Sequence, residues 1–254
     1  MLLSTQSSVL MEKVAQAVAP DPLRGPLWFQ LYWQSDRGMV SELIARAQAA
    51  GFEALVLTVD APVSGARDAE RRVQFRLPAG VSAVNLRASP AASRTDMDNL
   101  RDKAPGWSEL TWLVSQTKLP VIVKGVLHPA DAVAARDAGA AAVIVSNHGG
   151  RTLDSSPATA VMLPRIADAV GASLPLLVDG GIRRGTDVLK AMALGARAVL
   201  VGRPAVWGLA NAGPLGVAHV LRLLRDELEI AMALCGCTDL AKADASLLGP
   251  PHGT

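Results

Sequence analysis

Short apolar runs alternate with helix-like stretches along most of the chain. Each run is rich in Val, Ile, Leu or aromatic residues and is followed by Gly, Pro or polar residues, as is typical of buried parallel strands. We predict strands at residues 28–33, 54–60, 120–125, 142–147, 175–181 and 198–203. Amphipathic or Ala-rich segments lie between them and end just before a glycine, the usual signal of a helix C-terminus, at residues 40–50, 131–138 and 187–194. This alternation predicts βα units and a parallel sheet.

One connection is much longer than the others. Residues 60–119 separate the second predicted strand from the third; residues 62–93 are rich in Arg, Pro, Ala and Ser, and residues 107–117 look helical. So long a stretch inside a compact domain is usually a functional lid or a disordered loop. We interpret it as a lid within one domain that spans residues 1–254 and ends in a loose tail at residues 247–254.

Composition narrows the class of protein. Half of the 254 residues are hydrophobic, which suffices for one sizeable core, and the formal net charge is only +2 with both signs interspersed. This balance argues against a nucleic-acid or membrane surface. No apolar run reaches the ~18 residues of a spanning helix and no signal peptide opens the chain, so we expect a cytoplasmic protein. Cys235 and Cys237 are interpreted as reduced thiols, and no metal site is expected.

Polar residues gather where the predicted strands end. Several form pairs two residues apart, which a strand places on one face; these pairs are Gln30 and Tyr32, Thr58 and Asp60, and Ser146 and His148. Lys124 and Asp179 close two further strands. Barrels and open α/β sheets place their sites at the carboxyl ends of parallel strands. The pattern therefore predicts a functional site at that edge.

The run from Asp179 to Asp187, with sequence DGGIRRGTD, is the strongest local signal. Glycines let backbone N–H groups approach an anion, and the N-terminus of a following helix favours negative charge. Arginines after two adjacent strands add bidentate donors. We predict a phosphate site from Asp179, Gly180, Gly181, Arg183, Gly202 and Arg203. The alternative is a glycine turn with a solvated arginine pair.

His148 is the candidate general base, since imidazole titrates near neutrality and the residue follows a strand beside two glycines. Arg151 is suited to clamping a carboxylate, and Asp60 to orienting the histidine. Lys124 is suited to holding a phosphate, forming a Schiff base or stabilising negative charge on a cofactor ring. Its spacing does not choose among these three.

Together these residues resemble the FMN-dependent 2-hydroxy-acid dehydrogenase and oxidase family, which includes glycolate oxidase, lactate oxidase and mandelate dehydrogenase. The stretch 28–33 is most similar to the lactate and hydroxymandelate oxidase branch. The resemblance implies a (β/α)8 TIM barrel. It rests on Leu3-Ser4-Thr5, Trp28–Tyr32, Leu57–Asp60 with Gly65 and Arg67, Val123-Lys124-Gly125, Ser146–Arg151 with Asp154, Asp179–Asp187, and Gly202-Arg203-Pro204.

The resemblance also implies a role for each residue. His148 takes a proton from an (S)-2-hydroxy acid with help from Asp60, and Tyr32 bonds the substrate oxygen. Arg67 and Arg151 bind the substrate carboxylate. The implied FMN ligands are Lys124 at the pyrimidine edge, Ser4, Gln30, Thr58 and Ser146 at the ring or ribityl chain, and Asp179, Gly180, Gly181, Arg183, Gly202 and Arg203 at the ribityl and phosphate. The electron acceptor is O2 or another oxidant, and a homo-oligomer is expected.

The chain departs from the family's pattern at its N-terminal end. Members carry a further N-terminal part that supplies the first barrel strand, most of the second, and a substrate-binding tyrosine. We count six strands and a stub, where eight close a barrel. We therefore expect weak flavin binding, low activity and self-association. Two functions are alternatives to FMN-dependent oxidation of a 2-hydroxy acid. One is a truncated, non-catalytic remnant with weak FMN binding, and the other is another phosphate- or FMN-binding barrel enzyme such as an isomerase.

Overall fold

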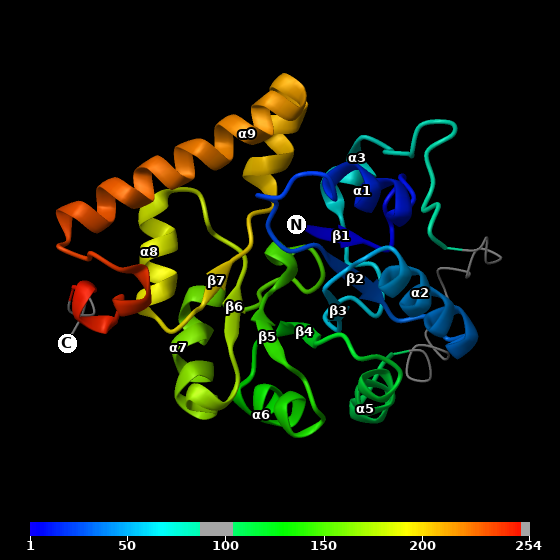
Figure 1. Ribbon diagram of the computed structural model, residues 1–254, viewed down its shortest axis with the longest axis horizontal. Helices are drawn as coiled ribbons and strands as arrows, with labels where there is room; N and C mark the ends of the chain where they lie inside the picture. The colour runs from blue at the N-terminus through cyan, green and yellow to red at the C-terminus, as the bar shows by residue number, and fades with distance from the viewer. Residues whose placement is uncertain (87–103, 250–254) are drawn as a thin grey trace. The chain divides into compact units, whose positions relative to one another are not determined.

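The computed structural model describes residues 1–86 and 104–249, which divide into two compact units (Figure 1). The first comprises Met1–Gly125 and Ala134–Ala141, and the second comprises Val126–Val133 and the chain from Ala142 onward. Each unit consists of parallel strands that alternate with helices. Residues 87–103 of the expected lid and residues 250–254 of the expected tail lie outside the described residues.

All six predicted strands are present, and the expected stub is a seventh short strand. Neighbours in each unit pair in parallel and in chain order. The strands are β1 (Leu2–Ser4), β2 (Trp28–Tyr32), β3 (Ala54–Thr58), β4 (Val121–Val126), β5 (Ala142–Val145), β6 (Leu176–Val178) and β7 (Ala198–Val199). All of the predicted strands except β4 end earlier than predicted at the carboxyl end, whereas β4 extends one residue further, to Val126.

The predicted helices are also present. They end as expected, because Gly51, Gly139 and Gly195 have φ of 84°, 94° and 105°, a left-handed conformation that favours glycine. The α-helices are α1 (Met11–Val18), α2 (Arg37–Ala49), α3 (Asp68–Arg72), α5 (Trp107–Ser115), α6 (Pro129–Asp137), α7 (Thr159–Val170), α8 (Gly185–Ala193) and α9 (Arg203–Leu234). The described residues also form the 3-10 turns η1 (His148–Gly150), η2 (Gly171–Ser173), η3 (Leu240–Lys242) and η4 (Ala245–Leu247).

The core of the first unit lies on one face of β2, β3 and β4. Phe29, Leu31, Leu55 and Leu57 are at most 1% exposed. Phe29 meets the ring of Phe52 edge to face at a centroid distance of 5.6 Å. Because alternate residues of a strand point to opposite faces, this packing assigns the intervening residues to the other face.

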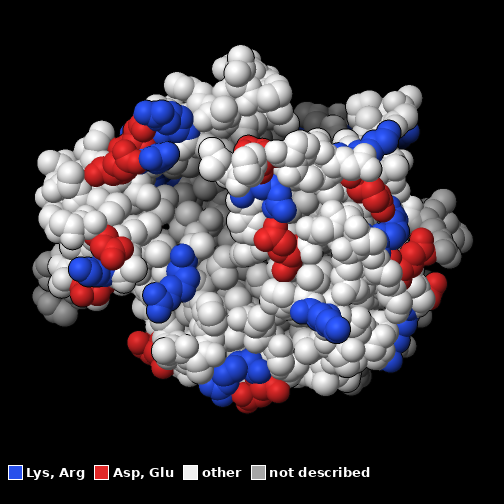
Figure 2. Space-filling view, viewed as in Figure 1, with Lys and Arg blue, Asp and Glu red and all other residues white. Residues whose placement is uncertain are grey.

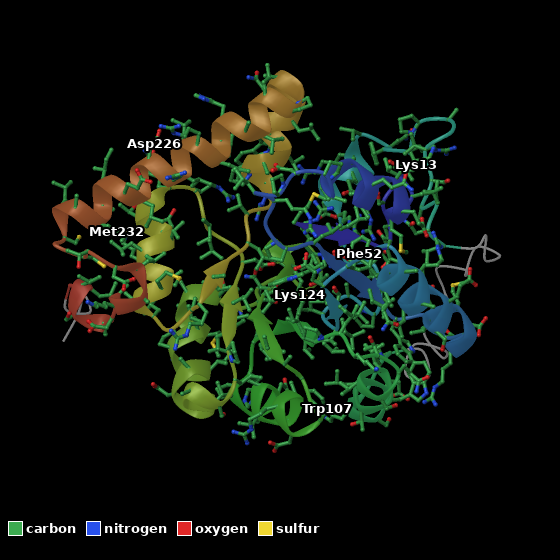
Figure 3. The ribbon with its side chains drawn as sticks, in the orientation of Figure 1. Lys13, Phe52, Trp107, Lys124, Asp226 and Met232 are labelled. Atoms are coloured by element: carbon green, nitrogen blue, oxygen red, sulfur yellow. The ribbon has the colours of Figure 1, made fainter. Side chains whose placement is uncertain are left out.

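In the second unit, α9 runs beside α8. The helix breaks at Ala212 and Gly213, whose φ values of −146° and 59° are not helical. Beyond the break, α9 contributes Ala231 and Met232 to an apolar cluster that Leu247 of η4 also contacts (Figure 3). Among the described residues, no helix has the length and apolar character needed to cross a bilayer. Basic and acidic side chains are interspersed on the face shown in Figure 2.

The segment that precedes residue 87 is fixed to the first unit by buried Asn85. Its Oδ1 accepts from the N–H of Met11 at 2.9 Å, and its Nδ2 donates to the carbonyl of Val9 at 3.1 Å. Arg46 donates both to the Asn85 carbonyl and to Glu12, at 3.2 and 2.8 Å. The hydrogen bond from Arg46 holds the pKa of the Glu12 carboxyl below its ordinary value. Glu12 therefore stabilises the fold only while it is ionised.

This depressed pKa predicts a pH-dependent stability. The Glu12 contribution is fully present above the ordinary pKa of 4.5 and is lost as pH falls through the lower folded-state value. Because the pair is partly exposed, we expect Glu12→Gln to lower the free energy of unfolding by up to about 1 kcal/mol at pH 7. Urea titrations at several pH values check this. Glu229→Gln, which breaks the exposed Arg225 pair, is the control and leaves stability unchanged; a Glu12 effect that persists at pH 3 would contradict the assignment.

Candidate functional site

Strand register places five of the predicted residues on one face of the first unit's sheet. Tyr32 is the register partner of Thr58, and Thr58 is the partner of Lys124. Ser4 is likewise the partner of Gln30, which lies two residues before Tyr32. Register partners share a face, so we name the group formed by Ser4, Gln30, Tyr32, Thr58 and Lys124 the polar face. The expected same-face pairing of Gln30 and Tyr32 is confirmed.

Hydrogen bonds fix the side chains of the polar face. The amide of Gln30 donates to Thr58 Oγ1 at 2.7 Å and approaches the Tyr32 hydroxyl at 3.4 Å. Just past β1, the fully buried Thr5 hydroxyl donates to the Gln30 carbonyl at 2.5 Å and accepts from the Tyr32 N–H at 3.2 Å. Thr5 was not among the predicted residues, because the pairing depends on a strand that is 25 residues away. Buried polar groups that are satisfied in this way hold a single arrangement.

Lys124, two residues before the carboxyl end of β4, is only 6% exposed (Figure 3). Lysine is almost never this buried unless polar or charged groups surround it. Its register neighbour Thr58 and the Gln30 amide supply polar atoms on the same face. The polar face thus presents an amide, hydroxyls and an ammonium, which suit the edge of a polar heteroaromatic ring.

Asp60 lies directly against the backbone of Gly125, beside Lys124. The Cβ of any other residue at Gly125 would stand 2.6 Å from both Cβ and Cγ of Asp60, and its φ of 109° also favours glycine. The N–H of Val59 donates to the Lys124 carbonyl at 2.9 Å, which holds the two strand ends together. Only a glycine at position 125 therefore leaves room for the Asp60 side chain next to Lys124.

Arg67 lies outside this arrangement at the start of α3. Its guanidinium pairs with Glu70 at 3.4 Å, and both side chains are more than a third exposed. The exposed pair contributes little stability, so a carboxylate ligand can compete for the arginine. The substrate-binding role of Arg67 stays a prediction.

In the second unit, His148 stands in a left-handed turn after β5. His148, Gly149 and Gly150 have φ of 53°, 65° and 72°. The N–H of His148 donates to the Oγ of fully buried Ser146 at 3.1 Å. Strand alternation was expected to place Ser146 and His148 on one face, but β5 ends at Val145 and the turn orients His148 instead. The same applies to Asp60, since β3 ends at Thr58.

The predicted phosphate turn follows β6. Gly180 and Gly181 have φ of 84° and 78°, so their backbone N–H groups can face a bound anion as the prediction requires. The N-terminus of α8 contributes differently from the prediction. Asp187 already accepts from the N–H groups of Arg183 and Arg184 at 2.9 Å, and Glu227 accepts from Gly185 at 3.0 Å. Carboxylates of the chain itself occupy this helix end, so the predicted anion site is reduced to the glycine turn and the arginines.

The two arginines have defined contacts. Arg203 donates from Nη2 to the Gly149 carbonyl at 3.0 Å, which links the phosphate site to the His148 turn. The guanidinium of Arg183 lies 5.2 Å from the ring centroid of Trp207. This cation–π contact restrains the arginine and was missed in the sequence, where Trp207 resembles any exposed residue of an amphipathic helix. Exposed arginines beside left-handed glycines form a donor set that fits a phosphate ester.

The predicted site residues thus fall into two groups. The first unit holds Ser4, Gln30, Tyr32, Thr58, Asp60, Arg67 and Lys124, and the second holds Ser146, His148, Arg151, Asp179, Gly180, Gly181, Arg183, Gly202 and Arg203. Within each unit, strand register or hydrogen bonds bring several of these residues close together. The proposed pairing of His148 with Asp60 joins residues of different units and stays a prediction.

Parallel βα units with polar strand ends, a buried lysine and an arginine–glycine phosphate turn define a class: an α/β enzyme that binds a phosphorylated ring cofactor. The FMN-dependent dehydrogenase family model matches residues 1–250, and the chain belongs to that family. Its cofactor is FMN, and its members oxidise 2-hydroxy acids. The resemblance inferred from the motifs is confirmed.

Similar proteins agree with this membership. The chain is 47% identical to an L-lactate oxidase of Nostoc sp. over 98% of its own length and 70% of that oxidase. It is 44% identical to a 2-hydroxyacid oxidase of Dictyostelium discoideum, of which it covers 64%. A crystal structure of mandelate oxidase superimposes with a TM-score of 0.85 at 43% identity, over 96% of this chain and 67% of that protein. The predicted (β/α)8-barrel class is therefore confirmed for the part of the barrel that this chain contains.

The phosphate site leads to a prediction about FMN affinity. Arg183→Ala and Arg203→Ala each remove a charge-assisted donor and should weaken FMN binding by about 1–3 kcal/mol. Trp207→Leu leaves both arginines but removes the ring beneath Arg183, and should cost about 0.5–1 kcal/mol. Trp207→Phe should restore most of that loss.

Fluorescence titration with FMN measures these affinities. Trp107→Leu, which removes another exposed tryptophan from α5, is the control and leaves the affinity unchanged. Unaltered FMN affinity in both arginine variants would refute this placement of the phosphate.

Proposed function

We propose that the protein oxidises an (S)-2-hydroxy acid to the 2-oxo acid with FMN, and that His148 is the base. The observation that supports this most directly is the left-handed backbone of His148, since non-glycine residues in that conformation are rare and concentrate at functional sites. Its neighbours Ser146 and Arg203 bond the turn from two sides. A histidine held in this way is suited to transferring a proton at one fixed position.

The remaining residues divide the work of binding and charge stabilisation. Arg151 and Arg67 bind the substrate carboxylate, and Tyr32 donates to the hydroxyl oxygen that becomes the carbonyl. His148 accepts a proton from the hydroxyl or from the α-carbon, and Asp60 stabilises the resulting imidazolium. Bound FMN takes up the two electrons that the substrate loses. Buried Lys124 would lie at the edge of the ring together with Gln30 and Thr58, which bond each other on the same face.

For the FMN itself, Ser4 and Ser146 complete the ring and ribityl contacts, and Asp179, Gly180, Gly181, Arg183, Gly202 and Arg203 hold the ribityl and phosphate. L-lactate is the first substrate to test, since a relative 47% identical is an L-lactate oxidase. O2 is the proposed acceptor because that relative is an oxidase. We further propose a homo-oligomer in the cytoplasm, which sedimentation and cell fractionation test.

The reaction predicts that (S)-2-hydroxy acids and achiral glycolate reduce the flavin, whereas an (R)-2-hydroxy acid does not. Under anaerobic conditions, L-lactate, glycolate or (S)-mandelate mixed with FMN-loaded protein should bleach the oxidised-flavin absorbance, and admission of O2 should restore it. D-lactate is the matched control and leaves the spectrum unchanged. Oxidised flavin that persists with all three acids would exclude the proposed reaction and favour a flavin-binding protein with another activity.

The role of His148 predicts a separation of binding from turnover. His148→Ala should keep FMN bound and lower kcat by at least ~10²–10⁴, the usual contribution of a general base. His219→Ala, an exposed histidine of α9, is the control and keeps wild-type turnover. If His148→Ala abolishes FMN binding to the same degree as turnover, the histidine is structural.

A further inference from the structure

Asn147 precedes His148, and both its side chain and its backbone accept hydrogen bonds from the turn that follows. Its Oδ1 accepts from the N–H of Gly149 at 3.0 Å, and its backbone carbonyl accepts from the N–H of Gly150 at 2.9 Å. Asn147 is thus the N-cap of η1 and spans the three left-handed residues that follow it. No role was predicted for it from the sequence.

The turn needs this support because one of its residues is not a glycine. A left-handed backbone is unfavourable for a residue that carries a Cβ, and His148 adopts it at φ of 53°. Such a conformation persists only where surrounding bonds over-determine it. Ser146 bonds the N–H of His148, Asn147 bonds that of Gly149, and Arg203 bonds the Gly149 carbonyl.

The other end of the same amide reaches beyond the turn. Asn147 Nδ2 donates to the carbonyl of Pro157 at 3.2 Å, just before α7. At the start of α7, the Oγ1 of buried Thr159 donates to the carbonyl of Asp179 at 2.7 Å. A Cβ at Gly180 would stand 3.4 Å from Asn147 Oδ1 and 3.3 Å from Thr159 Oγ1. Asn147 therefore lies between the His148 turn, the entry to α7 and the phosphate turn.

We propose that Asn147 is a positioning residue for His148, which fixes the left-handed turn by accepting from Gly149 and anchors it to α7 by donating to Pro157. The proposal rests on His148 being the base. The geometry requires an acceptor and a donor on one short side chain, which asparagine supplies and aspartate or serine supplies only in part. Serine keeps an acceptor for the Gly149 N–H but is too short to reach Pro157.

The first experiment compares Asn147→Leu, Asn147→Ser and wild type. The leucine removes both bonds while keeping the branching at Cγ and the number of side-chain heavy atoms, so kcat should fall roughly 10- to 100-fold, the scale of a misplaced catalytic group. FMN affinity and KM should stay near their wild-type values. Asn147→Ser should recover most of the lost kcat, because the cap on Gly149 is restored.

The matched control is Asp239→Leu. Asp239 caps η3 with the same geometry, accepting from the N–H of Ala241 at 2.9 Å, but it lies near the C-terminal end of the chain. Its loss should leave kcat unchanged. Hydrogen exchange supplies a readout independent of turnover: amides of residues 148–151 should exchange faster in Asn147→Leu only, with other segments protected as in wild type.

A double variant separates positioning from general damage. If Asn147 acts through His148, Asn147→Leu combined with His148→Ala should be no slower than His148→Ala alone. Additive losses, or equal exchange increases throughout the second unit, would overturn the proposal. A His148→Ala variant with wild-type turnover would instead show that the proposed function has failed, while the exchange result would still report on the turn.

Discussion

The parallel register of β2, β3 and β4 is the constraint on which the first group of site residues depends. Backbone bonds alone align Tyr32, Thr58 and Lys124 in one row. A slip of one residue in any strand would send its polar groups into the apolar core and expose Phe29, Leu31 or Leu57. The same burial that holds the sheet together therefore also determines which polar atoms face a ligand. Thr5 extends this control just past β1, where its hydroxyl bonds Gln30 and Tyr32.

Past the strand ends, strand register no longer determines where side chains point. Backbone turns with positive φ orient them instead. Gly125, within β4, gives room for Asp60, which follows β3. Past the ends of β6 and β5, Gly180 approaches Asn147 and Thr159, and Gly149 lies under Arg203. Each glycine allows a contact that a Cβ would obstruct. The positions of Asp60 and His148 therefore depend on these glycines as much as on the polar residues themselves.

Sequence patterns predicted the strands and helix ends well because both signals are local. An apolar run indicates a buried strand, and Gly51, Gly139 and Gly195 mark helix ends through their own φ. Contacts between distant residues could not be predicted in this way. Glu227 caps α8 from 42 residues away, so the helix end looked available to a phosphate when a carboxylate already bonds it. Trp207 under Arg183 was missed for the same reason. The shared face of Ser146 and His148 was wrong because alternation cannot reveal where a strand stops.

The cations of the two units work under different electrostatic conditions. Lys124 is buried, so its charge acts in a medium of lower dielectric and salt screens it little. Arg183 and Arg203 are exposed, so salt weakens their attraction for a phosphate. Under the proposed function, ionic strength should therefore weaken FMN affinity more than it alters the influence of Lys124 on the ring. Under the same proposal, the exposed arginines capture and release the FMN phosphate, while the buried Lys124 lies at the edge of the ring. The contacts with Trp207 and Gly149 partly offset the screening, because they hold the guanidinium groups in place before the phosphate binds.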